Sequence, residues 1–174
     1  MEETANKRSR TDVRGLLTWT LLAVFVTVAD YVSKRLIVRY LMPVGSVTVI
    51  PGIFDFTYLE NRGAAFGMLE DHPWIHTAIS LAAVIGISVY LVIERKAKRS
   101  QWLNAAAGMM IGGGIGNLID RLSQGYVVDF IETKFMKFAI FNVADSFVTV
   151  GAAILLVYVI VSEIKTAKKQ GSDG

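Results

Sequence analysis

The stretch FAIFNVADSFVTVGAAILLVYVIV, residues 138–161, decides the fold class of this chain. Its 24 residues carry one charge, Asp145, and are long enough to cross a bilayer as a helix. A carboxylate at bilayer depth costs about 2.5–3.5 kcal/mol on insertion scales, so such a residue is by default a candidate functional group. The stretch therefore predicts a transmembrane helix that carries a functional acid.

A second acid, Asp129, lies sixteen residues upstream in the apolar patch YVVDFI, residues 126–131. Closely spaced carboxylates cannot both ionise cheaply, so a pair that meets favours acid–base chemistry with a shared proton. Intramembrane acids also serve as proton relays in transporters. Asp129 and Asp145 are therefore the candidate catalytic pair, with a proton-coupled transporter as the alternative.

Composition places the chain in a membrane. It has 174 residues, of which 53% are hydrophobic and 19% charged, with a mean hydropathy of +0.46. These values indicate one integral membrane domain rather than a soluble globule. The net charge of +3 does not indicate a nucleic-acid partner, because most Lys and Arg residues bracket apolar segments.

The inventory of reactive side chains is short. The chain has no cysteine, which excludes disulfides, thiol catalysis and cysteine-ligated metals. Its two histidines, His72 and His76, have a metal-like spacing, but no third ligand of that kind is nearby. We therefore expect neither a metal nor a Ser–His site.

Four apolar runs predict an all-α membrane protein with four transmembrane helices: residues 16–40, 74–93, 102–119 and 141–161. Asp30 interrupts the first run. That run loosely resembles a cleaved signal peptide, but its pattern continues unbroken past Asp30 and Lys34, so an uncleaved span is preferred. We expect a single domain, 1–174, with a basic N-terminus at 1–14 and a flexible tail at 163–174.

The distribution of basic residues predicts the orientation. Eleven lie before span one, between spans two and three, or after span four, against seven in the other loops. By the positive-inside rule both termini should be cytoplasmic. The external loop between spans one and two holds VTVI, then Pro51-Gly52, then IFDFTY, a pattern typical of strand, turn and strand. A small extracytoplasmic sheet with one aromatic and one polar face is expected there, suited to an extended peptide or to lipid.

Polar groups mark the ends of spans one, three and four. Asp30 and Lys34 are spaced for a helical ion pair, which is also their simplest structural explanation. Span three carries Gly108, Gly112 and Gly116, a stripe that lets another helix approach closely. It ends in Asn117, Asp120 and Arg121, for which a polar helix end with a surface ion pair is the competing structural explanation. Asn142 and Asp145 open span four, where capping of the helix is the competing explanation.

Taken together and in order, five blocks resemble the lipoprotein signal peptidases, also called signal peptidase II. The resemblance covers roughly residues 16–162. The matching residues are Asp30, Ser33 and Lys34; the run Asn61-Arg62-Gly63-Ala64-Ala65-Phe66; Gly116, Asn117, Asp120 and Arg121; Val127-Val128-Asp129-Phe130; and Phe141, Asn142, Ala144, Asp145 and Ser146.

The resemblance implies a bacterial aspartic endopeptidase of the inner membrane, without a cofactor, with its active site near the extracytoplasmic face. Its substrates would be prolipoproteins, cut just before a cysteine that bears a diacylglyceryl group, and its other partners membrane lipids; a monomer is expected. The catalytic dyad maps onto Asp129 and Asp145. Residues that bind substrate or support the dyad map onto Asp30, Lys34, Asn61, Gly63, Asn117, Asp120, Arg121 and Asn142. Tyr31 stands where the family usually has Gln.

In the implied mechanism one aspartate is ionised and takes a proton from water, while the other is protonated and hydrogen-bonds the scissile carbonyl. Either aspartate could hold either role, because a coupled pair titrates as a unit. Asn117, Asn142 and Arg121 would orient substrate or stabilise developing negative charge. Two rivals remain: the transporter, against which the absence of internal repeats counts, and a membrane module that binds lipid or peptide without catalysis.

Overall fold

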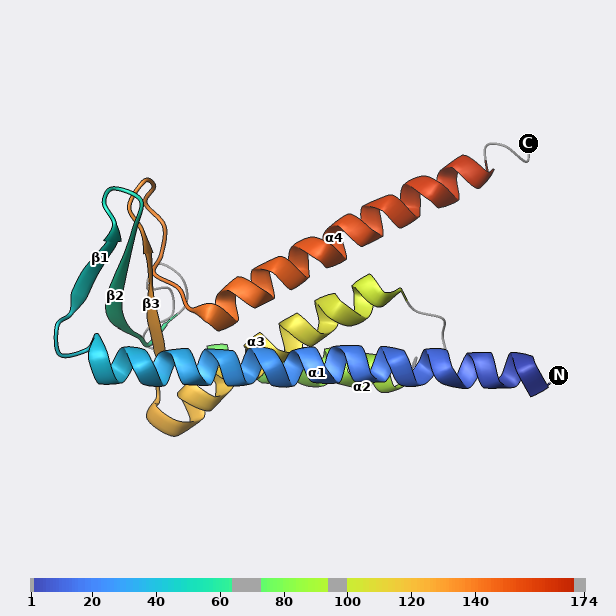
Figure 1. Cartoon of the computed structure of the whole chain (residues 1–174), viewed down its shortest axis with the longest axis horizontal. Helices are drawn as coiled ribbons and strands as arrows, with labels where there is room; N and C mark the ends of the chain where they lie inside the picture. Colours follow the sequence, from blue (N-terminus) through green and yellow to red (C-terminus); the bar gives the residue numbers. More distant parts are fainter. Residues whose placement is uncertain (1, 64–72, 94–99, 171–174) are drawn as a thin grey trace.

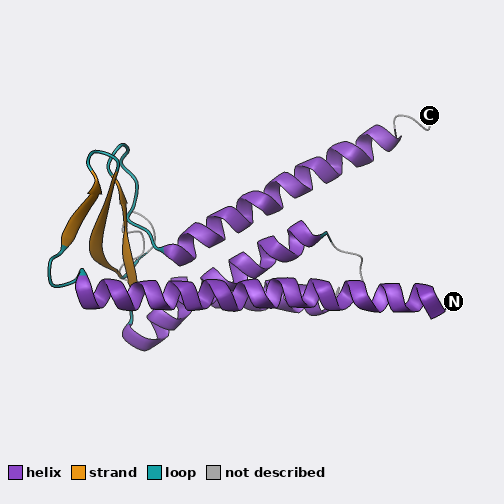
Figure 2. Ribbon diagram, viewed as in Figure 1, coloured by secondary structure: helices purple, strands orange, loops and turns teal. Residues whose placement is uncertain are grey.

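The computed structural model describes residues 2–63, 73–93 and 100–170. Four helices and three strands follow one another as α1 (Glu2–Tyr40), β1 (Ser46–Ile50), β2 (Phe54–Asn61), α2 (Pro73–Ile93), α3 (Gln101–Gln124), β3 (Val127–Thr133) and α4 (Val143–Gln170). The sheet lies at one end of the helices, and the start of α1 and the end of α4 lie at the other, as Figure 1 and Figure 2 show. The mostly helical fold with a small sheet agrees with the expected class.

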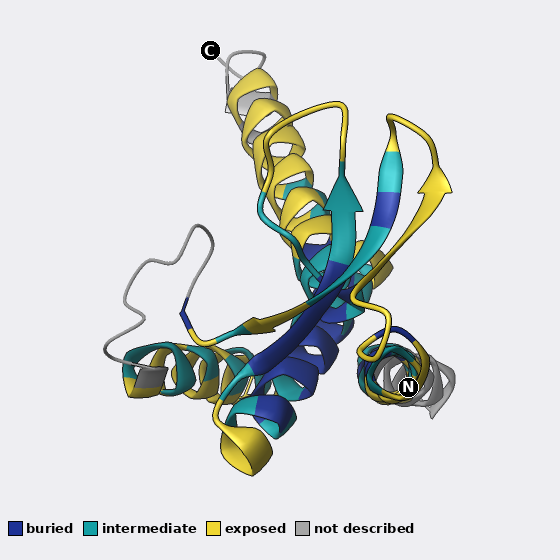
Figure 3. Ribbon diagram, turned by 90° about the vertical axis from the view of Figure 1, so that its left-hand side faces the viewer, coloured by how far each residue is buried: buried dark blue, intermediate teal, exposed yellow. Residues whose placement is uncertain are grey.

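Three of the described helices are long and apolar enough to cross a membrane: Val13–Tyr40, Trp74–Ile93 and Val143–Lys165. They correspond to the first, second and fourth predicted spans. The third predicted span is also helical, as α3, but it is not among these three. Its buried residues include Asn104, Asn117 and Asp120. Because α3 packs against α1, α2 and α4, its polar groups are covered by protein and the helix need not be apolar all round (Figure 3).

The glycines of α3 set the spacing between the helices. A Cβ at Gly112 would lie 2.6 Å from the carbonyl oxygen of Ala23 on α1, and one at Gly113 would lie 2.6 Å from the carbonyl oxygen of Ala144 on α4. A Cβ at Gly116 would lie 2.5 Å from Asp30 Oδ2. The predicted close approach of a neighbouring helix is therefore confirmed, and it brings α1 and α4 against the polar end of α3.

We expect Gly112→Ala to destabilise the folded protein by about 1–3 kcal/mol, because the new methyl group overlaps the α1 backbone. Thermal unfolding in detergent micelles would measure this as a lower Tm. Gly86→Ala on α2 is the matched control, since a Cβ there meets nothing within 4 Å. The close-packing account would be wrong if both variants unfolded at the wild-type temperature.

The sheet has the order β1-β2-β3 and is antiparallel throughout. Strands β1 and β2 form the predicted hairpin, with Gly52 at φ 73° in its turn. The sheet is not confined to the loop between the first two spans, as the sequence had suggested: β3 comes from the segment after α3. Pairing between residues so far apart in the chain leaves no local signal. The apolar patch at 126–131 alone therefore does not show that this segment is a strand paired with β2.

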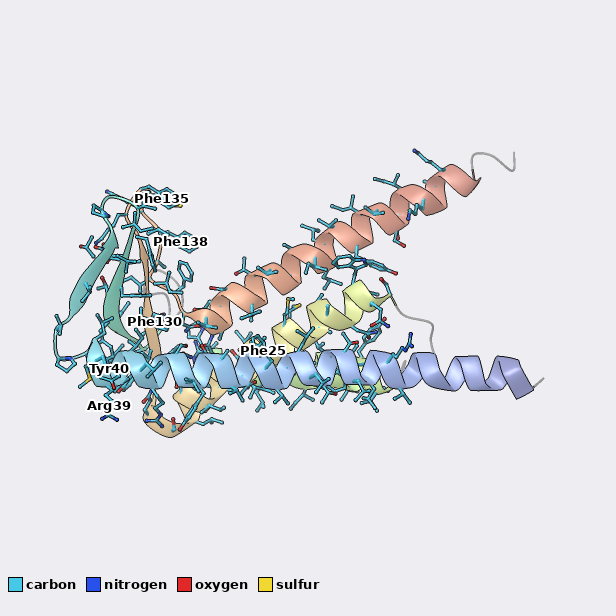
Figure 4. All side chains as sticks on the ribbon, viewed as in Figure 1. Phe25, Arg39, Tyr40, Phe130, Phe135 and Phe138 are labelled. Carbon is cyan, nitrogen blue, oxygen red and sulfur yellow. The ribbon has the colours of Figure 1, made fainter. Side chains whose placement is uncertain are left out.

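The two predicted faces of the sheet are present. On one face Phe54 and Phe56 stack edge to face at 5.0 Å, and Phe56 lies 5.9 Å from Phe130 of β3. Figure 4 shows Phe130, with Phe135 and Phe138 of the following loop, on the side of the sheet toward α4. On the other face Asp55 pairs with Lys134 at 3.2 Å. The aromatic face therefore lies toward the helices that are apolar enough to enter the bilayer.

Helix α4 continues to Gln170, whereas the sequence had suggested a flexible tail from residue 163. Strong helix formers, among them Glu163, Lys165, Ala167 and Lys168, favour continuation of the helix through this segment. Of the expected tail, only residues 171–174 lie outside the described residues.

Candidate active site

The two candidate acids meet where the sheet joins the helices. Asp129 is on β3 and is 1% exposed, and Asp145 is in the first turn of α4. The start of α4 and strand β3 are tied together by Phe141, whose backbone exchanges hydrogen bonds with Ile131. Both acids contact the same residue, Asn142. The structure therefore brings together the pair that lies sixteen residues apart in the sequence.

Asp129 receives a donor on each carboxylate oxygen. Asn61 Nδ2 donates to Oδ2 at 2.7 Å, and Asn142 Nδ2 donates to Oδ1 at 2.7 Å. Burial raises the pKa of Asp129 to about 7, the negative charge of Asp145 adds to the rise, and the bonds from Asn61 and Asn142 oppose it. Asp129 is thus poised to hold a proton near neutral pH.

Asp145 and Asn142 cap α4 reciprocally. The backbone N–H of Asp145 donates to Asn142 Oδ1 at 2.9 Å, and the backbone N–H of Asn142 donates to Asp145 Oδ2 at 3.2 Å. This is the geometry of a capping box, built here with Asn and Asp. The capping explanation and the functional one are compatible, because the second carboxylate oxygen, Oδ1, accepts from Asn117 Nδ2 at 2.8 Å.

A buried lysine fixes the orientation of Asn117. Lys34 is 3% exposed, and its Nζ donates to Asn117 Oδ1 at 2.9 Å. An ammonium group can only donate, so the oxygen of the Asn117 amide must face Lys34 and its NH2 group must face Asp145. Asn142 Nδ2 also donates to Asn117 Oδ1, at 3.1 Å.

The other two amides are fixed by the backbone in the same way. Asn142 Oδ1 accepts from the N–H of Asp145, and Asn61 Oδ1 accepts from the N–H of Gly63 at 3.0 Å. Each amide therefore turns an NH2 group toward a candidate catalytic carboxylate. Three asparagines on β2, α3 and the start of α4 form a donor cradle around the two acids.

Lys34, which donates to this cradle through Asn117, also forms ion pairs with two further acids. It pairs with Asp30 Oδ2 at 2.8 Å and with Asp120 Oδ2 at 3.0 Å. Each acid in turn accepts from a backbone amide: Asp30 from Ala144 at 2.9 Å and Asp120 from Val128 at 3.1 Å. The buried network ties α1, α3, β3 and α4 together, which is how four separate segments hold one site.

Arg121 follows Asp120 at the end of α3. Its guanidinium interacts electrostatically with Asp145, Asp129 and Asp120. Among the described residues none of the close ion pairs involves Arg121. The guanidinium N–H groups of Arg121 are therefore within electrostatic range of Asp129 and Asp145, and they take no part in the ion pairs that Lys34 forms.

Tyr31, the departure from the usual family pattern, points away from the site. It is 43% exposed, and the Arg35 guanidinium lies 5.0 Å from its ring centroid. Asp30 draws its partners from Lys34 and from the backbone of Ala144 instead. The substitution therefore leaves the bonds of Asp30 in place.

All ten site residues named from the sequence are described, and they gather at this one junction. Residues 64–66 of the matching block and His72 lie outside the described residues. No sequence pattern marks the backbone donors of Gly63, Val128 and Ala144, since every residue type except proline offers the same N–H. Gly113 was also left unassigned, although the run of three glycines at 112–114 was a signal of close packing.

The fold and the site define a class: a multi-pass membrane protein with paired carboxylates in a cradle of amide donors. Comparisons with known proteins agree. Residues 22–161 match the family described as Signal peptidase (SPase) II. A lipoprotein signal peptidase of Caldanaerobacter subterraneus is 48% identical over 136 residues, covering 78% of this chain and 90% of that protein. One of Streptococcus pneumoniae is 45% identical, covering 78% and 87%.

A solved structure shares the fold as well. A bacterial membrane enzyme determined by the in meso method at 2.3 Å resolution superposes with a TM-score of 0.75 at 34% identity, covering 84% of this chain and 89% of that one. The chain belongs to the signal peptidase II family. It is accordingly a protease and a bacterial inner-membrane protein that crosses the membrane more than once.

Proposed function

We propose that this chain is an aspartic peptidase in which Asp129 and Asp145 activate a water molecule against the scissile peptide bond. The observation that carries the proposal is the shared contact with Asn142, which donates to Asp129 from its side chain and is linked to Asp145 by two hydrogen bonds, each from a backbone N–H to a side-chain oxygen. The family's activity, the cleavage of lipoprotein signal peptides, is the activity that this pair would perform. The transporter alternative has no support from the family or from its relatives.

The environment of each acid suggests its role. Asp129, whose pKa is raised by burial, would carry the proton and hydrogen-bond the scissile carbonyl. Asp145 would be ionised and accept a proton from water as the water oxygen attacks the carbonyl carbon. Asp145 then gives this proton to the amide nitrogen as the C–N bond breaks, and one water molecule is consumed. Both acids end the cycle in their starting protonation states.

The remaining site residues divide by what they contact. Asn61, Asn117 and Asn142 already donate to the acids, so we assign them to positioning the dyad rather than to binding the carbonyl oxygen. Arg121 is the candidate to stabilise the negative charge that develops on that oxygen. Asp30, Lys34, Asp120 and Gly63 would hold the cradle in place. No metal or organic cofactor enters this scheme.

The substrates are prolipoproteins, and we propose that cleavage falls just before a cysteine that carries a diacylglyceryl group. The aromatic face of the sheet, formed by Phe54, Phe56 and Phe130, is the candidate support for that lipid and the extended chain beside it. We propose that the protein acts as a monomer, as a single domain over 1–174, with membrane lipids around its helices.

We propose that α3 also spans the membrane, which gives four spans, both termini in the cytoplasm and the site near the external face. Eleven basic residues lie before span one, between spans two and three or after span four, against seven in the other loops, and this excess supports the orientation. The start of α1 and the end of α4 also lie at the same end of the helices. A reporter fused after Gly174 should therefore be active only in the cytoplasm. A signal from an externally active reporter at the same position would reverse the orientation.

The pH dependence of cleavage should respond to Asn61. Its hydrogen bond favours the ionised form of Asp129 and so opposes the raised pKa. Without that bond the pKa of Asp129 rises further, so in Asn61→Ala the alkaline fall of kcat/KM should move to higher pH, with a rate lower by roughly tenfold.

A neighbouring variant controls for this measurement. Arg62 is next in sequence but pairs with Glu60 at 3.3 Å and lies over the ring of Tyr126. None of the ion pairs among the described residues joins it to Asp129 or Asp145. Arg62→Ala should leave the alkaline limb where it is in the wild type. An alkaline limb that stays in place or moves to lower pH in Asn61→Ala would exclude Asp129 as the protonated acid.

A further inference from the structure

A groove far from the active site lies between the first turn of α3 and the last turns of α4. Figure 1 shows α4 leaning away from the other helices toward the end that carries both termini. The opening is about 650 Å³ in volume. Its lining comes from these two helices and the residue before α3: Ser100, Trp102, Ala153, Ile154, Val157, Tyr158, Val161, Ser162 and Lys165.

The lining changes character along α4. Ala153, Ile154, Val157 and Val161 make one part of the groove apolar, while Ser162 and Lys165 make the part nearer the end of α4 polar. From Ala153 to Lys165 the helix rises about 18 Å, comparable with the length of an extended acyl chain. The groove is thus shaped for an amphiphile that lies along α4 with its head at Lys165.

The positive charge of Lys165 at the polar end of the groove favours an amphiphile with a negatively charged headgroup. Lys165 is the last residue of the candidate span, and within the described part of the chain no carboxylate forms an ion pair with it. Basic pockets between transmembrane helices bind anionic lipid headgroups. A signal peptide is a poorer occupant, because its positively charged first segment would meet Lys165.

We propose that this groove is a binding site for an anionic phospholipid, with one acyl chain against Ile154 and Val157 and the headgroup at Lys165. The site is separate from the catalytic proposal and stands or falls without it. It lies at the opposite end of α4 from Asp145. The lipid would fill the space that the lean of α4 leaves open within the membrane.

Quenching of Trp102 fluorescence by bromine-labelled acyl chains tests this proposal. Trp102 lines the groove and is 67% exposed, and Trp19→Phe with Trp74→Phe would make it the sole tryptophan. The protein would be reconstituted into vesicles with brominated phosphatidylglycerol or brominated phosphatidylcholine at equal mole fraction. We expect an apparent preference of about fivefold for phosphatidylglycerol, as one lysine near the surface would give.

Two variants separate a site from general attraction. Lys165→Gln should remove the preference, whereas Lys168→Gln, the same change one turn along α4 and outside the groove lining, should keep it. Equal quenching by the two lipids in the wild type would overturn the proposal, as would equal losses in both variants. Loss of quenching when a synthetic signal peptide is added would assign the groove to that peptide instead.

Native mass spectrometry gives a second readout that needs no tryptophan replacement. Wild-type protein released from mixed micelles should retain one phosphatidylglycerol more often than Lys165→Gln does, and Lys168→Gln should behave as the wild type. Retention that is the same in all three proteins would also overturn the site.

Discussion

Replacing either Asp129 or Asp145 with asparagine should lower the cleavage of a diacylglyceryl-modified prolipoprotein by about 10⁴-fold, the upper range for loss of a general acid or base. The amide has nearly the size of the carboxyl group, but it can neither take a proton from water nor hold one for the carbonyl oxygen. Each variant should still fold, because the amide oxygen keeps one of the two donors that the carboxylate accepts, although the new NH2 group faces the other donor and loses that bond. Single-turnover assays with purified protein and a lipid-modified substrate would measure the loss.

Asp55→Asn is the matched control for these variants. Asp55 is also a buried acid, 7% exposed, but it lies on β2 and pairs with Lys134 rather than with a residue of the site. Its replacement should leave turnover near the wild-type rate, and a chelator added to the wild type should do the same. Substantial turnover by Asp129→Asn or Asp145→Asn would refute the dyad, and inhibition by the chelator would point to a metal instead.

Lys34→Met should destabilise the protein by about 3–5 kcal/mol, because it leaves the carboxylates of Asp30 and Asp120 buried without their cation. The long apolar side chain of methionine fills a similar volume, so the effect reports mainly on charge. The same change removes one of the two donors to Asn117 Oδ1 and leaves only Asn142 Nδ2, so the amide that donates to Asp145 is held less firmly. We therefore expect both a large fall in Tm in detergent micelles and a loss of activity in the fraction that remains folded.

The neighbouring cation provides the control for this second variant. Arg35 is exposed and stacks on Tyr31, so Arg35→Met removes the same charge from α1 at little cost to stability. Adding Asp30→Asn to Lys34→Met should recover part of the stability, since one of the uncompensated charges is gone, without restoring activity. Equal Tm values for Lys34→Met and Arg35→Met would show that the buried network contributes nothing to the fold.

The helices and the acids were predictable because their signals are local. Runs of about twenty apolar residues are visible regardless of what surrounds them, and the second predicted span, 74–93, lies within one residue of the bounds of helix α2, Pro73–Ile93. A carboxylate in such surroundings is equally visible. The ion pair of Asp30 with Lys34 follows from their spacing on one helix, and the structure places it as expected.

What the sequence could not supply is long-range geometry. The pairing of β3 with β2 brings Asn61 against Asp129 across a separation that no local pattern encodes. The direction in which each asparagine amide faces depends on partners from other segments, such as Lys34 for Asn117. The low apolarity of α3 is explained only by its position among the other helices, where Asn104 and Asp120 are buried in protein.

The measurement that tests the coupled dyad most directly is the titration of Asp129 itself. Protein labelled with ¹³C at the aspartate carboxyl groups would be followed by NMR against pH, with Asp129→Asn used to assign the resonance. We predict that Asp129 titrates near pH 7 in the wild type, because burial and the charge of Asp145 both raise its pKa. In Asp145→Asn the resonance should titrate at lower pH, since the like charge is gone. An Asp129 that titrates at the ordinary value of an aspartate, or whose titration is the same with and without the charge of Asp145, would contradict the account.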